Sequence, residues 1–417
     1  MPDSIDILRF ATAGSVDDGK STLIGRLLVD SKGVFDDQLE AIEGTSSSGE
    51  NKGIDFALLT DGLRAEREQK ITIDVAYRYF STPNRKFIIA DTPGHVQYTR
   101  NMFTGASNSD LAIILIDSRK GVLQQSKRHL YISWLLGIKY IIVAINKMDL
   151  VDYDQKTFDF ISRDFMSITS NLFIEKIDFV PISALKGDMV VQRGNKMPWY
   201  DGPTLIEILE SAKLNIIDYE GSIRFPVQLV NRVDNNKRKD FRGYMGRSLS
   251  GKISVGNEIK ILPTNKTSKV RELILSSKKV KEINFYDSGT ILLEDEIDIS
   301  RGDMFSSIGN EPQISNSVTA NICWMDEKQL GIKKKYLFKH CNKISKAIIK
   351  KIIYKVDMET LNQIPADNTL DMNDIGQVDI VLQNKIVFDS YSENKNTGSF
   401  ILINTDSNNT VAAGTIL

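Results

Sequence analysis

Apolar and polar positions in the first half of the chain follow one another in blocks that predict strands separated by helices. Two continuous apolar runs, at residues 111–117 and 140–145, have the length and composition of strands covered on both faces of a parallel sheet. Residues 125–136 lie between them and have the spacing of a helix. This strand–helix–strand rhythm predicts a doubly wound α/β domain.

The rest of this half adds further elements to the predicted domain. Residues 71–80 and 86–91 have strong β-propensity, and the short link between them contains Pro83 and Asn84, which favours an antiparallel hairpin. The other expected elements are a strand at 5–13, a helix beginning near 22, a polar loop at 36–53, a charged helix at 56–69, a strand at 178–182 and a last helix at 202–213.

Beyond a linker at 215–222 the helical patterns become rare. Short apolar runs such as 224–230, 258–262 and 378–382 read as strands, and closely spaced glycines between 246 and 256 indicate tight turns. Two small β-barrels fit this pattern best. We therefore expect three domains, at 1–215, 222–309 and 312–417, with the α/β domain first.

Composition narrows the classes of protein that the chain can belong to. The 417 residues are 41% hydrophobic and 26% charged, with a net charge of −1, which is ordinary for a globular protein and unlike a strongly basic nucleic-acid binder. The cysteines, Cys323 and Cys341, form no C-x-x-C pair. The start of the chain lacks a signal-peptide pattern, and no apolar run reaches about 18 residues. We expect a cytoplasmic protein with neither nucleic acid nor membrane as a partner.

The chemistry begins directly after the first predicted strand, with a phosphate-binding motif. Residues 14–21 fit G-x-x-x-x-G-K-[ST], in which glycines allow a tight turn and backbone N–H groups cradle phosphate oxygens. Lys20 is expected to reach the β- and γ-phosphates, and the Ser21 hydroxyl to bind Mg²⁺. The phosphate-binding residues predicted here are Gly14, Ser15, Val16, Asp17, Asp18, Gly19, Lys20, Ser21 and Thr22.

A second motif, Asp91-Thr92-Pro93-Gly94-His95, follows the strand at 86–91. A carboxylate at a strand end supports the metal in nucleotide-hydrolysing P-loop proteins, usually through water. Gly94 can place its backbone N–H against the γ-phosphate. On its own this motif would read as an ordinary turn, but its position after the phosphate loop favours a nucleotide site.

A third motif, Asn146-Lys147-Met148-Asp149, follows the apolar run at 140–145 and predicts the base. The Asp149 carboxylate can accept hydrogen bonds from both N1–H and the exocyclic amine of guanine, a donor pair that adenine lacks. We expect Asn146 to tie this loop to the phosphate loop and the Lys147 stem to lie along the base. Backbone N–H groups of Ser183, Ala184 and Leu185 are expected to meet the guanine O6. GTP is thus the predicted ligand, with Mg²⁺.

Together these motifs resemble those of GTPases of the translation-factor superfamily, and more closely the GTPase subunits (subunit 1) of bacterial sulfate adenylyltransferases. Asp18 is one marker, since elongation factors usually carry a histidine there. The resemblance extends over essentially the whole chain, through residues 58–69, 73–80, 97–102, 119–122, 241–244, 293–303, 335–340 and 397–403. It implies a P-loop GTPase domain followed by two β-barrels, as in elongation factors.

The resemblance also implies roles for individual residues. Mg²⁺ would be bound by Ser21 and Thr72, with Asp91 in the outer shell. His95 would orient the attacking water, and Val16 and Ile71 would gate its approach. Lys20, Thr72, Gly94 and His95 are the residues expected to act in hydrolysis. Lys70 replaces the glycine that the family usually has before the Ile-Thr pair, so this segment is expected to follow a different path.

The function that the resemblance implies is coupled catalysis by two subunits. A separate ATP-binding small subunit, sulfate adenylyltransferase subunit 2, would form adenylyl sulfate and pyrophosphate from ATP and sulfate, driven by GTP hydrolysis on this chain, in a heterodimer or higher hetero-oligomer. The sequence has no second P-loop, so a fused kinase domain is not expected. A translation GTPase that delivers tRNA is the alternative, and a nucleotide-binding scaffold without hydrolysis is a third.

Overall fold

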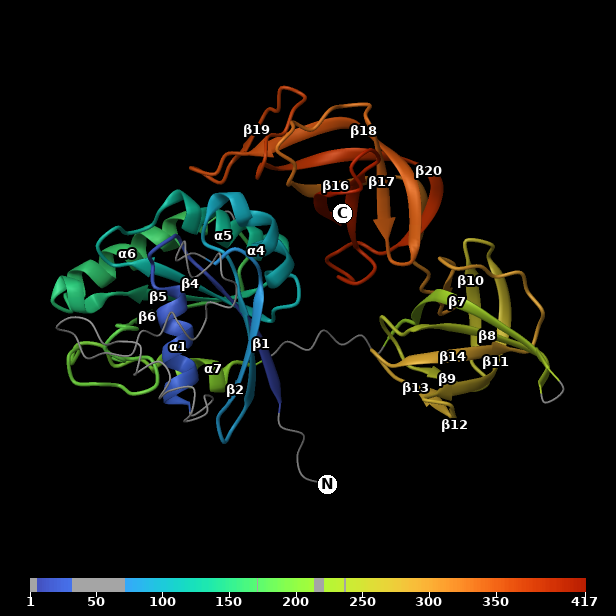
Figure 1. Cartoon of the computed structure of the whole chain (residues 1–417), viewed down its shortest axis with the longest axis horizontal. Coiled ribbons are helices and arrows are strands. Elements are labelled where there is room, and N and C mark those ends of the chain that lie inside the picture. The colour runs from blue at the N-terminus through green and yellow to red at the C-terminus, as the bar shows by residue number, and fades with distance from the viewer. Residues whose placement is uncertain (1–5, 32–71, 171, 214–220, 236–237) are drawn as a thin grey trace. The chain divides into compact units, whose positions relative to one another are not determined.

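The computed structural model describes residues 6–31, 72–170, 172–213, 221–235 and 238–417. The predicted loop at 36–53, the predicted helix at 56–69, Lys70, Ile71 and most of the linker lie outside the described residues. By its internal contacts the chain divides into two units, one of residues 1–215 with 357–362 and the other of residues 216–356 with 363–417. Figure 1 shows the elements of both units.

The first unit is built on a six-stranded sheet with strand order β2–β3–β1–β4–β5–β6. Every residue of β4 and all but the first of β5 are buried, which is why both strands read as continuous apolar runs. The four strands β1, β4, β5 and β6 pair in parallel, as do β1 and β3, whereas β2 is antiparallel to β3. The strands are β1 (Ile7–Ala13), β2 (Ala76–Ser81), β3 (Lys86–Asp91), β4 (Leu111–Asp117), β5 (Tyr140–Asn146) and β6 (Lys176–Pro181).

The hairpin predicted at 71–91 is present, but its first strand begins at Ala76. Two side chains account for the late start. The Asn101 amide donates to the carbonyl oxygen of Ile73 at 2.7 Å, and the Asp74 carboxylate accepts the backbone N–H of Val75 at 2.8 Å. These backbone groups are therefore satisfied outside a strand ladder.

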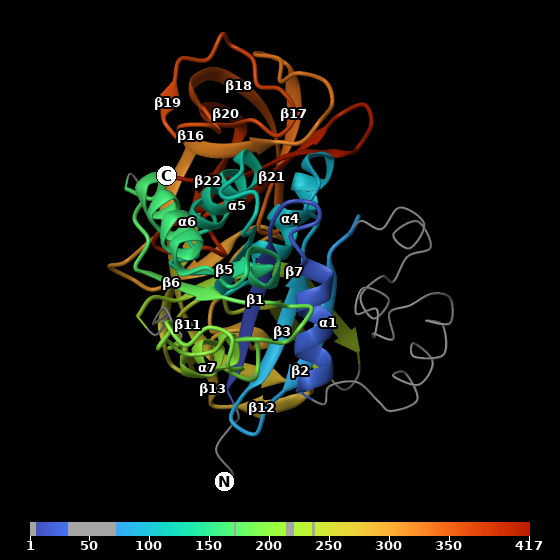
Figure 2. The same ribbon diagram turned by 90° about the vertical axis from the view of Figure 1, so that its left-hand side faces the viewer.

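Helices cover both faces of this sheet, as the alternating pattern predicts. Figures 1 and 2 show α1 and α7 on one side and α4, α5 and α6 on the other. The short helix α7 has a capping box, in which Thr204 and Glu207 each accept the other's backbone N–H. The helices are α1 (Lys20–Asp30), α4 (Thr99–Ala106), α5 (Gln124–Leu135), α6 (Gln155–Ile168) and α7 (Leu205–Ser211), with 3-10 turns η2 (Val96–Tyr98) and η3 (Met148–Val151).

The second unit contains two closed β-barrels. In the first, β10, β15, β7, β8, β14 and β11 pair in that order and β11 closes back onto β10; in the second, β17, β21, β22, β16, β20 and β18 close the ring through β17. Their cores include Phe225 and Phe305 in the first barrel and Trp324, Tyr336 and Phe338 in the second.

The strands of the first barrel region are β7 (Arg224–Asn235), β8 (Arg238–Arg247), β9 (Ile253–Ser254), β10 (Glu258–Leu262), β11 (Lys266–Leu275), β12 (Lys278–Val280), β13 (Glu282–Ile283), β14 (Ser288–Leu293) and β15 (Met304–Ser306). Those of the second are β16 (Gln313–Trp324), β17 (Lys335–His340), β18 (Lys343–Val356), β19 (Gln363–Ile364), β20 (Ile375–Phe388), β21 (Ser399–Asn404) and β22 (Thr410–Ile416).

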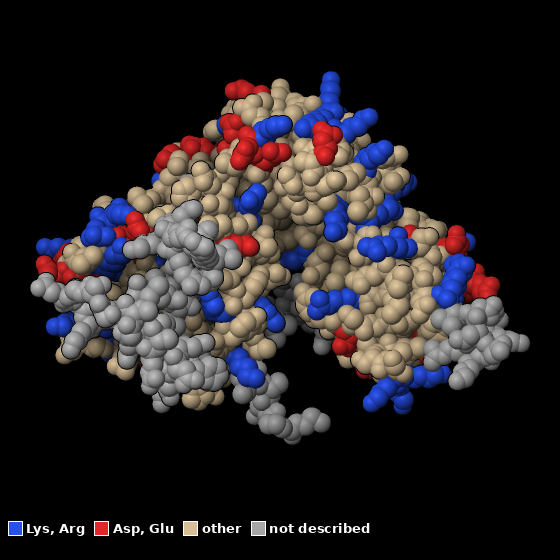
Figure 3. All heavy atoms as spheres, viewed as in Figure 1, with Lys and Arg blue, Asp and Glu red and all other residues tan. Residues whose placement is uncertain are grey.

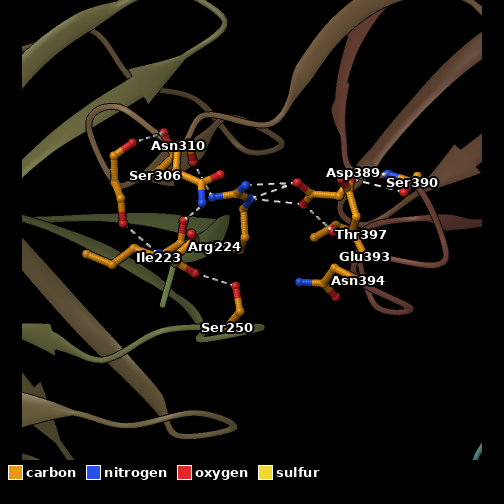
Figure 4. A network of polar contacts seen from close by, with 12 residues as sticks. Ile223, Arg224, Ser250, Ser306, Asn310, Asp389, Ser390, Glu393, Asn394 and Thr397 are labelled. Atoms are coloured by element: carbon orange, nitrogen blue, oxygen red, sulfur yellow. Dashed lines mark hydrogen bonds and ion pairs between the residues drawn. The ribbon is translucent and has the colours of Figure 1, made fainter. Parts of the chain in front are cut away.

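A buried ion pair joins the two barrels (Figure 4). Arg224, at the start of β7, donates from Nη2 and Nε to the Asp389 carboxylate at 2.8 and 2.9 Å. Asp389 also accepts the Thr397 hydroxyl at 2.6 Å, and Arg224 Nη1 donates to the carbonyl of Asn310 at 3.0 Å. The Arg224 and Asp389 side chains are 5% and 7% exposed, so the pair is shielded from solvent and salt.

We expect Asp389→Ala to destabilise the barrel unit by about 3–5 kcal/mol, because the guanidinium of Arg224 would remain buried without its partner. Urea unfolding measures the effect when it is followed by the fluorescence of Trp324 in a background in which Trp134 and Trp199 are replaced by phenylalanine. Asp406→Ala, at an exposed carboxylate of the same barrel, is the matched control. A loss below about 1 kcal/mol for Asp389→Ala would show that the pair contributes little beyond a surface ion pair.

Candidate nucleotide-binding site

All the predicted nucleotide motifs lie at one edge of the sheet, where parallel strands end. The register places Thr12 beside Asp91, Asp117 beside Asn146 and Ile145 beside Pro181. The segments that follow β1, β3, β4, β5 and β6 therefore start from the same edge. This is where open α/β sheets bind their ligands.

The phosphate loop runs from the end of β1 into α1. Gly19 has a φ of 93°, in the left-handed region that favours glycine, and a Cβ there would collide with the Asn146 side chain. Helix α1 begins at Lys20, directly after this turn. The loop thus leads into the positive end of a helix dipole, where phosphate oxygens are stabilised.

Lys20 is held inside the loop. Its ammonium group donates to the carbonyl oxygens of Gly14 at 2.8 Å and Ser15 at 3.0 Å, and the residue is only 7% exposed. Burial lowers the pKa of Lys20 from its ordinary value. An ammonium ion has three N–H donors, so this buried charge is suited to receive an anionic phosphate.

The Asp18 side chain stabilises the phosphate loop by a hydrogen bond to the loop's own backbone. Its carboxylate accepts the backbone N–H of Ser15 at 2.6 Å, and the residue is 1% exposed. Burial raises the pKa of this carboxyl group, and the nearby ammonium of Lys20 opposes that effect. Asp18 therefore acts as a support for the turn. The exposed or half-buried positions of the loop are Val16, Asp17, Gly19, Ser21 and Thr22.

Asp91, Thr92, Pro93 and Gly94 are buried at the end of β3, and His95 is half-buried. The Thr92 hydroxyl donates to the carbonyl of Thr12 at 2.7 Å, which joins this segment to β1. Gly94 lies so close to the phosphate loop that an added Cβ would meet Lys20 Nζ and would be 2.6 Å from the carbonyl oxygen of Gly14. The close approach explains why this position is a glycine.

We expect Gly94→Ala to weaken GTP binding by at least tenfold, because the added methyl group pushes against a backbone carbonyl that cannot rotate away. Isothermal titration with GTP measures the change. Gly121→Ala is the control: Gly121 has no atom within 4 Å of an added Cβ, but its φ is 69°, so this variant carries backbone strain without a clash. Equal GTP affinity in the parent and Gly94→Ala would contradict the interpretation.

Two side chains join the base loop after β5 to the phosphate loop: Lys147 donates to the carbonyl oxygen of Asp17, and Asn146 makes the second link. Asn146 donates from Nδ2 to the Asp18 carbonyl at 2.7 Å and accepts from the Ala184 N–H at 3.0 Å. The contact that the sequence predicts for Asn146 is therefore present. The Ser183 hydroxyl donates to Asp149 at 2.7 Å, which joins the predicted base-recognition carboxylate to the 183–185 segment. Met148 is buried, and Leu185 is exposed.

Two residues that the sequence analysis did not single out complete this arrangement. Asp117, at the end of β4, is fully buried in its side chain and pairs with Lys147 at 3.0 Å and Arg119 at 2.6 Å. These two cations hold the pKa of Asp117 well below its usual range, although burial opposes them. Arg26 on α1 donates to the carbonyl of Ala184 at 3.1 Å. The sequence did carry a signal for Asp117: it is a carboxylate at the end of an apolar strand, which is the position that identified Asp91 as a candidate site residue.

The residues present fit a Mg²⁺ site in which the protein and the nucleotide phosphates bind the ion together. Among the described residues there is no group of three or more His, Cys, Asp or Glu side chains that could hold a metal alone. Ser21 and Thr72 offer hydroxyl oxygens and Asp91 a carboxylate, which are the hard ligands that Mg²⁺ prefers, and Mg²⁺ is usually held by one or two protein groups together with substrate phosphates. These protein oxygens alone do not fill the coordination sphere of Mg²⁺, so phosphate oxygens of the nucleotide are needed as further ligands.

Comparison with known proteins is consistent with this geometry. Residues 5–236 match the elongation factor Tu GTP-binding domain, and residues 317–417 match the GTP-eEF1A C-terminal domain-like family. Sulfate adenylyltransferase subunit 1 of Saccharophagus degradans is 50% identical over 99% of this chain and 87% of its own length. The chain belongs to the sulfate adenylyltransferase subunit 1 family.

Other relatives agree with this membership. The bifunctional enzyme CysN/CysC of Mycobacterium tuberculosis is 47% identical over 99% of this chain and 67% of its own length. The Ski7 GTPase-like domain of S. cerevisiae, bound to GTP, has a TM-score of 0.54 at 18% identity, covers 99% of this chain and 97% of its own, and supports the fold alone. The predicted fold, an α/β P-loop GTPase domain followed by two β-barrels, is confirmed. No helix among the described residues is long and apolar enough to cross a membrane.

Proposed function

We propose that this chain is the GTPase subunit of a heteromeric sulfate adenylyltransferase. On a separate ATP-binding subunit, sulfate would attack the α-phosphorus of ATP, forming adenylyl sulfate and releasing pyrophosphate. The mixed phosphate–sulfate anhydride is high in energy, so this reaction is uphill. Hydrolysis of GTP to GDP and phosphate on this chain would drive it.

The observation that carries the nucleotide half of this proposal is the bridge made by Asn146. It joins the phosphate loop, the base loop and the 183–185 segment at one strand edge. A phosphate group held by Lys20 and a base held by Asp149 would then be positioned by one connected structure. The family membership supports the sulfate-activating half.

Each residue of the site has a proposed role. Lys20 and the loop N–H groups of residues 14–22 hold the phosphates, and Asp149 with the backbone of Ser183–Leu185 selects guanine. Ser21 and Thr72 would hold Mg²⁺, with Asp91 in its outer shell, and the bound ion would supply positive charge beside the phosphates. His95 orients the attacking water, and Val16 gates its approach together with Ile71, which lies outside the described residues. Gly94 is proposed to sense the γ-phosphate through its backbone.

Sulfate-dependent formation of adenylyl sulfate by this chain purified with its ATP-binding partner subunit tests the proposal. Product that rises strongly with GTP, and is lost in the Asp149→Ala variant, would support it. Product that is insensitive to GTP would leave this chain as a scaffold. GTP binding without product, and a GTPase rate stimulated by ribosomes, would favour a translation factor.

A further inference from the structure

The outer face of the second barrel carries an unusual mixture of side chains on β17 and β18. Between Lys328 and Val356 every charged residue is a lysine, and no arginine follows Arg301. Figure 3 shows lysine side chains of this barrel in blue, in the view of Figure 1. The chain as a whole has a net charge of −1, so positive charge is concentrated in this hairpin.

The strand register places these lysines beside branched aliphatic residues. Tyr336 and Phe338 of β17 point into the barrel and are buried, so the residues that alternate with them face outward. Opposite one another on the two strands lie Lys335 and Ile348, Leu337 and Lys346, and Lys339 and Ile344. We call these six residues the Lys–Ile face.

The face is unpartnered in the described chain. Lys335, Lys339 and Lys346 are exposed, and none has an ion pair with another described residue. Ile344 is 55% exposed. On the other side of β17, Ile401 and Ile403 of β21 pair with Lys339 and Leu337, which extends the aliphatic surface across a third strand.

This mixture differs from an ordinary solvated strand and from a nucleic-acid surface. A solvated face normally carries polar side chains of both charge signs. Binding of single-stranded nucleic acid relies on aromatic stacking and on arginine, and the Lys–Ile face has neither. Aliphatic side chains that can be buried, with cations that steer an approaching partner, suit a protein with an acidic surface.

We propose that the Lys–Ile face binds an acidic surface of the ATP-binding partner subunit. This inference rests on the proposed function, which requires such a subunit. Complementary charge would speed association, and burial of Leu337, Ile344 and Ile348 would slow dissociation. The nucleotide site is in the other unit of the chain, so nucleotide binding by the free chain does not depend on this face.

The test compares two double variants of the full chain. Lys339→Glu with Lys346→Glu reverses charge on the face, and Lys266→Glu with Lys278→Glu makes the same change on exposed lysines of the first barrel. Affinity for the purified partner subunit is measured by biolayer interferometry at several NaCl concentrations. We expect the first variant to bind at least tenfold more weakly at 0.1 M salt, mainly through slower association, with the difference shrinking as salt rises. The second should stay within about twofold of the parent.

Equal partner affinity in both variants would overturn the inference while leaving the proposed function intact. No binding of the unmodified chain to the partner would overturn both. Binding of a single-stranded oligonucleotide or of phosphatidylserine vesicles that is lost only in the Lys339/Lys346 variant, with partner affinity unchanged, would assign the face to a polyanion instead. Urea unfolding of each free variant, measured in parallel, shows that its barrels are folded. The milder Lys339→Gln with Lys346→Gln variant is expected to fall between the parent and the charge reversal.

Discussion

Asp149→Asn is expected to weaken GTP binding by roughly two orders of magnitude and to improve binding of xanthosine triphosphate. The carboxylate can accept two charge-assisted hydrogen bonds from guanine, and the loss of about 3 kcal/mol follows from replacing them. Xanthine has a carbonyl group where guanine has its exocyclic amine, so the amide of an asparagine can donate to it. The Ser183 hydroxyl, which donates to Asp149 at 2.7 Å, can still donate to the amide oxygen.

Competition between the two nucleotides in a fluorescence-displacement assay measures this exchange. Asp152→Asn is the matched control, because Asp152 is exposed, lies three residues away and has a left-handed φ of 51° that asparagine also tolerates. A variant that still prefers GTP over xanthosine triphosphate as strongly as the parent would show that Asp149 does not select the base.

Lys20→Met is expected to lower GTP affinity by at least about 100-fold without lowering thermal stability. Methionine keeps the unbranched stem but removes the charge that meets the phosphates, and hydrogen bonds to charged groups contribute about 1.5–3 kcal/mol each. Burial lowers the pKa of Lys20, which shows that keeping this ammonium group charged in the folded chain is costly. Removing it relieves that cost but also takes away the cation beside Asp18 and the hydrogen bonds to Gly14 and Ser15, so the melting temperature should change little.

Calorimetric titration with GTP and a thermal melt of the free variant supply the two readouts. Lys156→Met, at an exposed position on α6, is the control and should change neither. A large drop in melting temperature together with lost binding would indicate that Lys20 supports the fold of the loop, and would contradict a role in phosphate binding.

Much of this architecture follows from local patterns in the sequence. The buried strands β4 and β5 were predicted at their correct positions because parallel strands covered on both faces need continuous apolar runs. The strand at 258–262 matches β10 residue for residue. In the site, the motif position of Asn146 predicted its contact with the phosphate loop, whereas the close approach of Gly94 to Lys20 and Gly14 was not predicted.

What could not be predicted depends on groups distant in sequence. The late start of β2 results from Asn101, whose amide binds the backbone of Ile73. Asp117 ends an apolar strand, but its pairing with Lys147, 30 positions away, could not be predicted from that position. The pairing of Arg224 with Asp389 joins residues 165 positions apart, and periodicity carries no information on such a contact.

The most direct test of the nucleotide site is the relative affinity of the free chain for GTP and ATP in the presence of Mg²⁺. If the loops after β1, β5 and β6 form a guanine site joined by Asn146, GTP should bind at least about 100-fold more tightly than ATP, as expected from the loss of both guanine donors. Comparable affinities, or tighter binding of ATP, would contradict the assignment of Asp149 and with it the central claim.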